Sequence, residues 1–299
     1  MKSSVECIPC FVRQTLEAAK FVSKYSSVHE GVLREMLRCL AGIDFDQPPP
    51  VVGQCIHRKL RALIGNSDPY RGAKILHNQL ALALLPELKE LVRKSKDPLY
   101  TSVLLAIAGN VLDLGAHFNF TGHDMRSNIA EALSKPFHAD IEALRQEIQR
   151  ASSILYIADN AGEIVFDRLL IEEMQGKAVT VAVRGYPIIN DALAEDAQVA
   201  GIHEIARVIG NGSDAPGIVL SDCNVEFQMY FNNADVIIAK GQGNYETLSE
   251  EDKGNIFFLF KIKCDPVAFQ TGFKKGTNVL MPNKKRAKNS CHDQNDDRR

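Results

Sequence analysis

The second half of the sequence alternates between two kinds of segment, and this alternation restricts the fold more than any other feature. Short runs rich in β-branched residues are followed by a corner of small residues and, in most cases, by a helical pattern. Such alternation predicts parallel strands joined by crossover helices in an α/β sheet. The runs are ILYIAD at 154–159, VTVAVRG at 179–185, GIVLSD at 217–222, ADVIIAKG at 234–241 and IFFLFKIKC at 256–264.

The first half of the sequence has a different period. From Pro9 to about Arg150 apolar residues recur at helical spacing, as in FVRQTLEAAKFV at 11–22 and ILHNQLALALLPELKELV at 75–92, and strand-like runs are hard to find. We therefore expect a helical N-terminal domain over 1–150 and an α/β domain with a mainly parallel sheet over 151–282. Residues 283–299 are polar and charged, which predicts a disordered tail.

Charge and composition restrict the classes of protein to which the chain can belong. The 35 basic and 37 acidic residues give a net charge of −2, so no overall field attracts nucleic acid or an anionic membrane. No run approaches the roughly 18–20 apolar residues of a membrane span, and the opening residues lack the apolar stretch of a signal peptide. The seven cysteines are too thinly spread for a secreted disulfide framework. We expect a cytoplasmic protein, whose oligomeric state the sequence does not reveal.

Polar residues follow three of the predicted strands at the points where those strands end. Asp159 and Asn160 follow the first run, Asn190 and Asp191 follow the second, and Lys240 ends the fourth. In open parallel sheets, ligands bind beyond the carboxyl ends of the strands, because loops and helix N-termini converge there. The five side chains are therefore expected at one rim of the sheet.

The residue types at this rim indicate a metal and a phosphate. Asp159, Asn160 and Asp191 carry the hard oxygen atoms that Mg²⁺, Mn²⁺ and similar divalent ions prefer. Lys240 and the backbone N–H groups of 241–244 suit a phosphoryl group held against such an ion. An Asp or Asn at one strand-to-helix corner is more often a helix N-cap, but the coincidence of three strand ends favours a metal site.

Two glycines in the turn after Lys240 add little by themselves. Gly241 and Gly243 form a G-x-G turn, which occurs wherever a backbone needs positive φ. The sequence contains neither G-x-G-x-x-G nor G-x-x-x-x-G-K-[ST], so the dinucleotide and P-loop patterns lack their defining parts.

Six stretches of the sequence form a pattern: CIPC at 7–10, GNVLD at 109–113, DNAGEIVFD at 159–167, RGYPIINDA at 184–192, AKGQGNYE at 239–246 and KC at 263–264. Taken together they resemble the DUF89 family of metal-dependent damage-control phosphatases, and specifically its prokaryotic subfamily with an N-terminal C-x-x-C. The resemblance implies a helical N-terminal region joined to a Rossmann-like α/β/α domain. It also implies a divalent ion such as Mg²⁺, Mn²⁺, Co²⁺ or Ni²⁺ on Asp159, Asn160 and Asp191, and a contact between Lys240 and substrate phosphate.

Further polar residues near these segments are candidates for binding substrate. Asn110 and Asp113 lie three apart on a predicted helix and therefore share a face, where they either form a second wall of the site or make a buried contact between domains. Glu163 and Arg184 lie beside the ligand segments, where each either contacts substrate or forms a structural ion pair. The full candidate set is Asn110, Asp113, Glu163, Arg184, Asn190, Lys240, Gly241, Gly243 and Asn244.

The predicted reaction is hydrolysis of a small phosphomonoester, with sugar phosphates and damaged phosphometabolites as the substrates that the resemblance suggests. A metal-activated water attacks phosphorus in line. Asp159 is interpreted as a ligand and not as a covalent nucleophile, because the second Asp of haloacid-dehalogenase-type phosphatases is replaced here by Ala161. Two alternatives stay open: an S-adenosylmethionine-dependent methyltransferase, which the missing glycine-rich first loop disfavours, and a non-catalytic metal-stabilised binding module.

Cys7 and Cys10 form a C-x-x-C pair at a predicted helix start. The βαβ context of a thioredoxin-like redox motif is absent. If the N-terminus packs near the last strand, Cys264 becomes a third thiolate, and the three sulfurs form a second metal site for zinc or iron. The alternative is that all three are reduced, structural cysteines.

Overall fold

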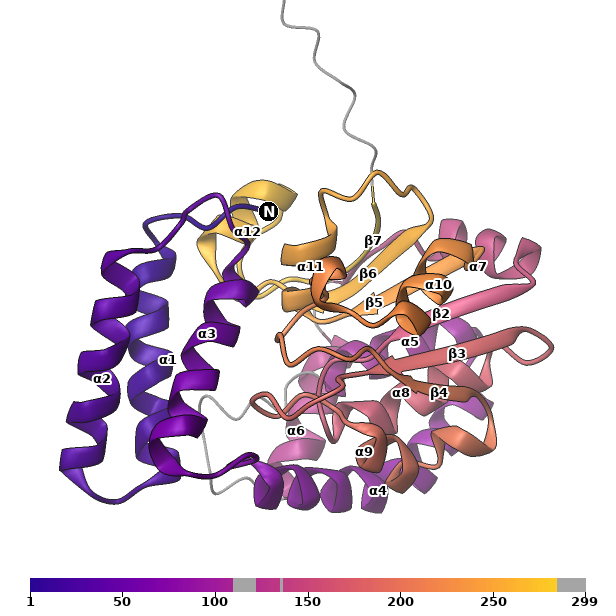
Figure 1. Cartoon of the computed structure of the whole chain (residues 1–299). Coiled ribbons are helices and arrows are strands. Elements are labelled where there is room, and N and C mark those ends of the chain that lie inside the picture. Colours follow the sequence, from indigo (N-terminus) through magenta and orange to yellow (C-terminus); the bar gives the residue numbers. More distant parts are fainter. Residues whose placement is uncertain (110–121, 135–136, 284–299) are drawn as a thin grey trace, which may run out of the picture.

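The computed structural model describes residues 1–109, 122–134 and 137–283. Three helices form a bundle at one side of the molecule (Figure 1), and three more follow before the sheet begins. Their apolar stripes bury residues such as Phe11, Met36 and Leu60 between the first three helices. These helices are α1 (Cys7–Val22), α2 (Ser26–Ala41), α3 (Pro49–Ile64), α4 (Arg71–Lys94), α5 (Pro98–Ala108) and α6 (Gly122–Ser134).

The strands of the described residues form one sheet in the order β1-β7-β6-β5-β2-β3-β4. All neighbours pair in parallel except β6 and β7, which are antiparallel. The carboxyl ends of β2, β3 and β5 therefore meet at one edge. The strands are β1 (Phe137–Ala139), β2 (Ser153–Ile157), β3 (Ala178–Val183), β4 (Arg207–Gly210), β5 (Val236–Lys240), β6 (Ile256–Lys261) and β7 (Asn278–Pro282).

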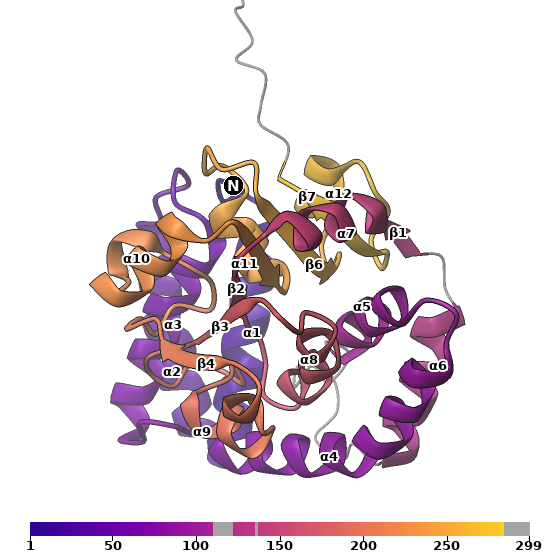
Figure 2. The same ribbon diagram turned by 90° about the vertical axis from the view of Figure 1, so that its right-hand side faces the viewer.

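Helices cover both faces of the sheet. α4 and α5 pack on α8, and Figure 2 shows all three on the same side. Side chains alternate along each strand, so Tyr156 and Ile238 face this layer, whereas Leu155 and Ile237 face α10 and α11. The remaining helices are α7 (Ile141–Arg150), α8 (Glu163–Glu172), α9 (Ala194–Val199), α10 (Val225–Asn233), α11 (Gln242–Leu248) and α12 (Asp265–Thr271), with short 3₁₀ turns at Ile202–Glu204 and Leu220–Asp222.

The mixed α/β class with a mainly parallel sheet is confirmed, but one expected run is not a strand and three observed strands, β1, β4 and β7, were not predicted. The run GIVLSD is a loop and a 3₁₀ turn, and β4 comes from the preceding segment RVIG. Close packing explains the loop, since a Cβ on Gly217 would lie 2.7 Å from the carbonyl oxygen of Gly243 and 3.1 Å from Pro50. The segment is held between α3 and α11 and does not join the sheet.

The helical region is packed against the sheet across the predicted boundary at Arg150. β1 precedes that boundary and pairs with β7, and α4 and α5 share an apolar core with α8. On α3, Gln54, Arg58 and Arg61 all donate hydrogen bonds to Asp214. Residues 284–299, most of the predicted tail, lie outside the described residues.

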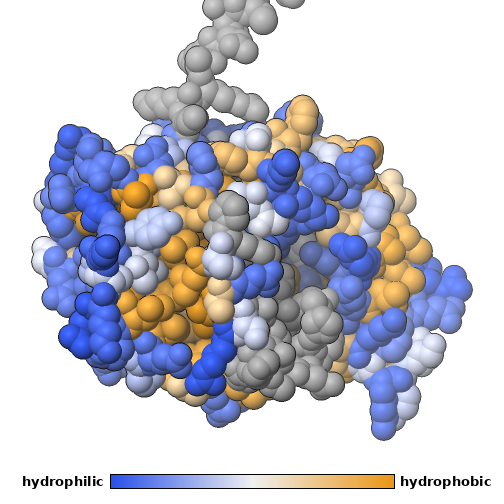
Figure 3. Space-filling view, turned by 180° about the vertical axis from the view of Figure 1, so that it is seen from behind, coloured by the Kyte–Doolittle hydropathy of each residue, from blue (hydrophilic) through white to orange (hydrophobic). Residues whose placement is uncertain are grey.

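Apolar and hydrophilic residues are separated on the rear of the molecule. Figure 3 shows apolar residues gathered on either side of the undescribed residues and hydrophilic residues along the outer margins. In the part of the chain that the structure describes, no helix has the length and apolarity that crossing a membrane requires.

Candidate active site

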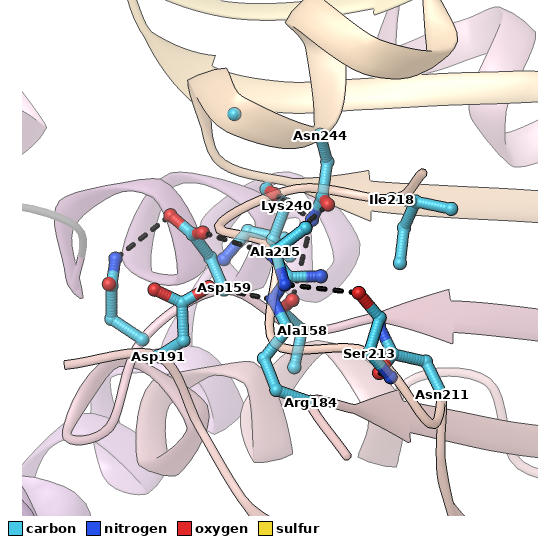
Figure 4. Close-up of polar contacts among 12 residues, drawn as sticks. Ala158, Asp159, Arg184, Asp191, Asn211, Ser213, Ala215, Ile218, Lys240 and Asn244 are labelled. Atoms are coloured by element: carbon cyan, nitrogen blue, oxygen red, sulfur yellow. Dashed lines mark hydrogen bonds and ion pairs between the residues drawn. The ribbon is translucent and has the colours of Figure 1, made fainter. Parts of the chain in front are cut away.

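The corner after β2 and the segment after β3 lie against each other. The amide of Ala161 donates to the carbonyl oxygen of Asn190 (2.8 Å), and the amide of Ala192 donates to that of Asp159 (2.8 Å). Between these bonds, Asn160 and Asp191 form an isolated antiparallel bridge. The three predicted ligands are thus brought together from two strand ends, and Figure 4 shows the Asp159 and Asp191 carboxylates side by side.

The carboxamide of Asn160 is oriented by two carboxylates. Its Nδ2 donates to Asp159 Oδ2 (2.8 Å) and to Glu163 Oε2 (3.0 Å). Since both N–H groups are engaged, the amide oxygen is the atom that remains to bind a cation. Glu163 begins α8 and is fully buried, so this orientation is set from within the core.

Arg184 supports the second ligand. It ends the β3 segment, its Nε donates to Asp191 Oδ2 (2.6 Å), and its Nη2 donates to Asn244 Oδ1 (3.2 Å). Asn244 in turn donates to the carbonyl oxygen of Lys240 (2.7 Å). Arg184 and Asn244 are buried, so both act as structural supports of the ligand segments in this arrangement.

Negative charge is concentrated at this rim. Burial, together with the charges of Glu163 and Asp191, raises the pKa of Asp159 to about 8, against the attraction of Lys263 and Arg184. Burial also raises the pKa of Asp191, although Arg184 opposes it. Buried carboxylates of this kind are stabilised by a cation, so the donor set fits a divalent ion.

The same donor set limits how an ion would be held. Among the residues that the structure describes, no three His, Cys, Asp or Glu side chains gather into a metal site. An ion at this rim would therefore be bound by the carboxylates of Asp159 and Asp191 and the amide oxygen of Asn160. Its remaining positions would be filled by oxygen atoms from water or substrate, as is usual for Mg²⁺.

Gly241 allows the β5 turn to approach Asp159. Its φ of 79° lies in the region that favours glycine, and a Cβ there would lie 2.0 Å from Asp159 Oδ2. Gly243 has a similar role in packing, because its Cβ would lie 2.1 Å from the carbonyl oxygen of Pro216. Both glycines are thus required by close contacts, which the sequence pattern alone did not indicate.

Lys240 lies beneath the rim and is fully buried. Its Nζ donates to Asp167 Oδ1 (2.5 Å), Glu163 Oε1 (2.6 Å) and the carbonyl oxygen of Ala106 (2.8 Å). Burial alone would lower the pKa of Lys240, but Asp167 and Glu163 hold that pKa above its ordinary value. The structure therefore shows Lys240 as an internal ion-pair partner, and its contact with substrate phosphate stays a prediction.

Lys263 is the exposed cation at this rim, and sequence reasoning did not select it. It follows β6, its amide donates to Gln242 Oε1 (2.8 Å), and its ammonium lowers the pKa of Asp159 and of Glu246. A signal was present in the sequence, since Lys263 is the next-to-last residue of the run IFFLFKIKC, as Lys240 is of the run ADVIIAKG.

Comparison with known proteins identifies the family. The chain matches the model of the damage-control phosphatase ARMT1-like domain over residues 3–279. It belongs to this family. A damage-control phosphatase of Pyrococcus horikoshii is 36% identical over 95% of this chain and 99% of its own length, and one of Archaeoglobus fulgidus is 35% identical over 93% and 98%.

A solved structure of this damage-control phosphatase family supports the same conclusion. The crystal structure of a DUF89 family protein from Pyrococcus horikoshii superposes with a TM-score of 0.86 at 35% identity, covering 95% of this chain and all of that one. The resemblance to DUF89 is therefore confirmed, and membership in the C-x-x-C subfamily stays a prediction.

Two predicted contributions to the damage-control phosphatase site are placed differently or not at all. Asn110 and Asp113 lie outside the described residues. Asn190 is buried beside Asp191, and its Nδ2 has no hydrogen-bond partner among the described residues. Among the described residues of the helical region, α4 reaches this site, since Lys74 lowers the pKa of Asp191 and Asn78 bonds to the β2 corner; a second wall of Asn110 and Asp113 stays a prediction.

The N-terminal segment, which carries Cys7 and Cys10, lies near Cys264, as the predicted second metal site requires. The N-terminal amine of Met1 donates to the carbonyl oxygen of Glu246. Burial is the largest cause that raises the pKa of Cys10 and of Cys264, and the nearby Cys7 raises both further. The three thiols are free, and they are not gathered into a metal site in the described structure. A zinc or iron site on them stays a prediction.

Proposed function

We propose that this damage-control phosphatase is metal-dependent and hydrolyses small phosphomonoesters, such as sugar phosphates or damaged phosphometabolites. One observation carries the proposal: Asp159, Asn160 and Asp191 meet at a buried, negatively charged rim that a divalent ion would neutralise. The membership of the chain in a phosphatase family supports the same reaction class.

The chain's own residues have separate roles in this proposal. Asp159 and Asp191 hold the ion with Asn160, whose amide is oriented by Glu163. When bound, such an ion polarises the phosphoryl group and lowers the pKa of a coordinated water. Lys263, which faces the solvent at the same rim, attracts the phosphate and offsets charge on its oxygens.

No specific observation favours the alternatives. The loop that follows β2 contains one glycine, Gly162, and so lacks the glycine-rich turn that brings a dinucleotide-like cofactor close to the backbone. Asp159 has Ala161 in place of a second Asp, so the chain lacks the partner of a covalent aspartyl mechanism.

The central test is phosphate release from a panel of sugar phosphates and other phosphomonoesters. Protein stripped with a chelator is expected to be inactive, and added Mg²⁺, Mn²⁺, Co²⁺ or Ni²⁺ is expected to restore turnover. Turnover by the stripped protein at the metal-loaded rate would refute metal dependence. Methyl transfer from S-adenosylmethionine, without phosphate release, would support the methyltransferase alternative instead.

Lys263→Ala is expected to raise KM for a phosphomonoester about tenfold or more while kcat changes little. A charge-assisted hydrogen bond contributes roughly 1.5–3 kcal/mol, and 1.4 kcal/mol corresponds to a factor of ten. Lys274→Ala, which removes another exposed lysine after β6, is the matched control and should leave KM unchanged. Equal KM values for the two variants would exclude Lys263 from phosphate binding.

A further inference from the structure

Asn78 on α4 uses both ends of its carboxamide in buried contacts with the α/β region. Its Oδ1 accepts a hydrogen bond from the amide of Gly162 (2.7 Å), and its Nδ2 donates to Asp196 Oδ1 (2.7 Å). The side chain is 3% exposed, so neither bond is readily replaced by water. The two partners lie 34 residues apart in the sequence and reach Asn78 from different segments.

These partners belong to the two segments that carry the candidate metal ligands. Gly162 closes the corner that begins with Asp159, and it is the N-cap of α8 without a side-chain cap of its own. Asp196 lies on α9, just after Asp191, and its Oδ2 accepts the amide of Leu193 (2.9 Å). One amide from the helical region therefore joins the ends of both ligand segments.

The surroundings of Asn78 explain why an amide is required. The Gly162 side presents a donor and the Asp196 side presents an acceptor, and a carboxamide offers an acceptor and a donor at these two positions, whereas an ionised carboxylate offers only acceptors. Lys74, one turn earlier on α4, lies 2.8 Å from Asp68 and 3.9 Å from Asp196, so the local charge is already arranged around an ionised Asp196. A carboxylate at position 78 would face that of Asp196.

We propose that Asn78 is a positioning residue that fixes the separation between the segment of Asp159 and the segment of Asp191, and thereby sets the affinity of the rim for a divalent ion. The proposal rests on the metal dependence proposed above. It adds that the helical region, through one side chain that touches neither metal nor substrate, controls how well the ion is held.

The test is a reciprocal exchange of the hydrogen-bonding pair. Asn78→Asp places two carboxylates in contact. Asp196→Asn turns an N–H donor toward either the side-chain N–H of Asn78 or the backbone N–H of Leu193. The double variant Asn78→Asp/Asp196→Asn reverses the bond between the two side chains, leaves both side chains an oxygen to accept from the amides of Gly162 and Leu193, and keeps the same net charge. Gln79→Glu makes the same chemical change on the exposed face of α4 and is the matched control.

Two measurements distinguish a positioning role of Asn78 from a general loss of folded structure. Mn²⁺ binding, measured by calorimetry without substrate, is expected to weaken about 10- to 100-fold in each single variant and to return to within about threefold of wild type in the double variant. Hydrogen exchange of the amides in 159–163 and 189–193, measured without metal, is expected to accelerate in the single variants and to recover in the double. Gln79→Glu should match wild type in both.

Single variants with wild-type Mn²⁺ affinity and wild-type exchange would overturn the proposal, as would a folded double variant that recovers neither. If Asn78→Asp does not fold, Asp196→Asn and the double variant give the same comparison. A wild-type protein that binds no Mn²⁺ would refute the metal-dependent function, whereas the exchange pattern would still decide whether Asn78 positions the two segments.

Discussion

Asp159→Asn is expected to lower kcat/KM for a phosphomonoester by roughly a hundredfold to a thousandfold, the loss typical of removing one preorganised electrostatic group. The amide retains an oxygen for the Asn160 contact but no longer supplies a charged ligand. Because burial near Glu163 and Asp191 raises the pKa of Asp159 to about 8, the metal-free carboxyl carries its full charge only above that pH, where the substitution also removes repulsion. The metal-free variant should therefore melt at or above the wild-type temperature.

Two measurements complete this experiment. Added Mn²⁺ should raise the melting temperature of wild type, since a ligand that binds only the folded state stabilises it, and should have little effect on Asp159→Asn. Asp46→Asn removes a carboxylate whose side chain is 78% exposed and should behave like wild type in both assays. Wild-type turnover by Asp159→Asn would remove Asp159 from the site and with it the proposed mechanism.

Gly241→Ala is expected to abolish metal-dependent turnover and to reduce the free energy of unfolding by about 3–5 kcal/mol. The strained backbone contributes roughly 1–3 kcal/mol and overpacking a similar amount. The added Cβ would lie 2.0 Å from Asp159 Oδ2, so either the carboxylate or the β5 turn must move. Urea unfolding and turnover measured well below the melting temperature give the two results separately.

Gly272→Ala is the matched control for this substitution. Gly272 has nearly the same φ, 77° against 79°, but its ψ is 7° where that of Gly241 is 156°, and nothing lies within 4 Å of the Cβ position. It should therefore lose only about 1–2 kcal/mol and retain full activity. If the two variants behave alike, neither the close contact with Asp159 nor the different ψ of Gly241 has a role, and positive φ alone explains the loss.

The strand-end rule predicted that the three candidate ligands meet. Asp159, Asn160 and Asp191 follow β2 and β3, which are parallel neighbours, so their meeting follows from sheet geometry alone. Lys240 also ends a strand, yet it points beneath the rim. Alternation explains this result, because Lys240 shares a face with Ile238, which packs against the α8 layer.

The partners of Lys240 were visible in the sequence. Glu163 and Asp167 lie four residues apart in the apolar helix α8 and so share one face, which indicates a buried cation opposite them. Asn78 carried a comparable signal, since Lys74, His77 and Asn78 fall on the buried stripe of α4. The sequence did not reveal that α4 packs on α8, because apolar periodicity indicates which face of a helix is buried but not which element covers that face.

The position of α4 has a consequence for how the protein can be divided. Residues 1–150 make buried contacts with the α/β region: Asn78 bonds to Gly162 and Asp196, and the carbonyl oxygen of Ala106 accepts from Lys240. A chimaera that joins this half to the α/β half of a distant relative would inherit mismatched bonding partners next to the ligands. In a working chimaera, these residues and their bonding partners would have to come from the same parent protein.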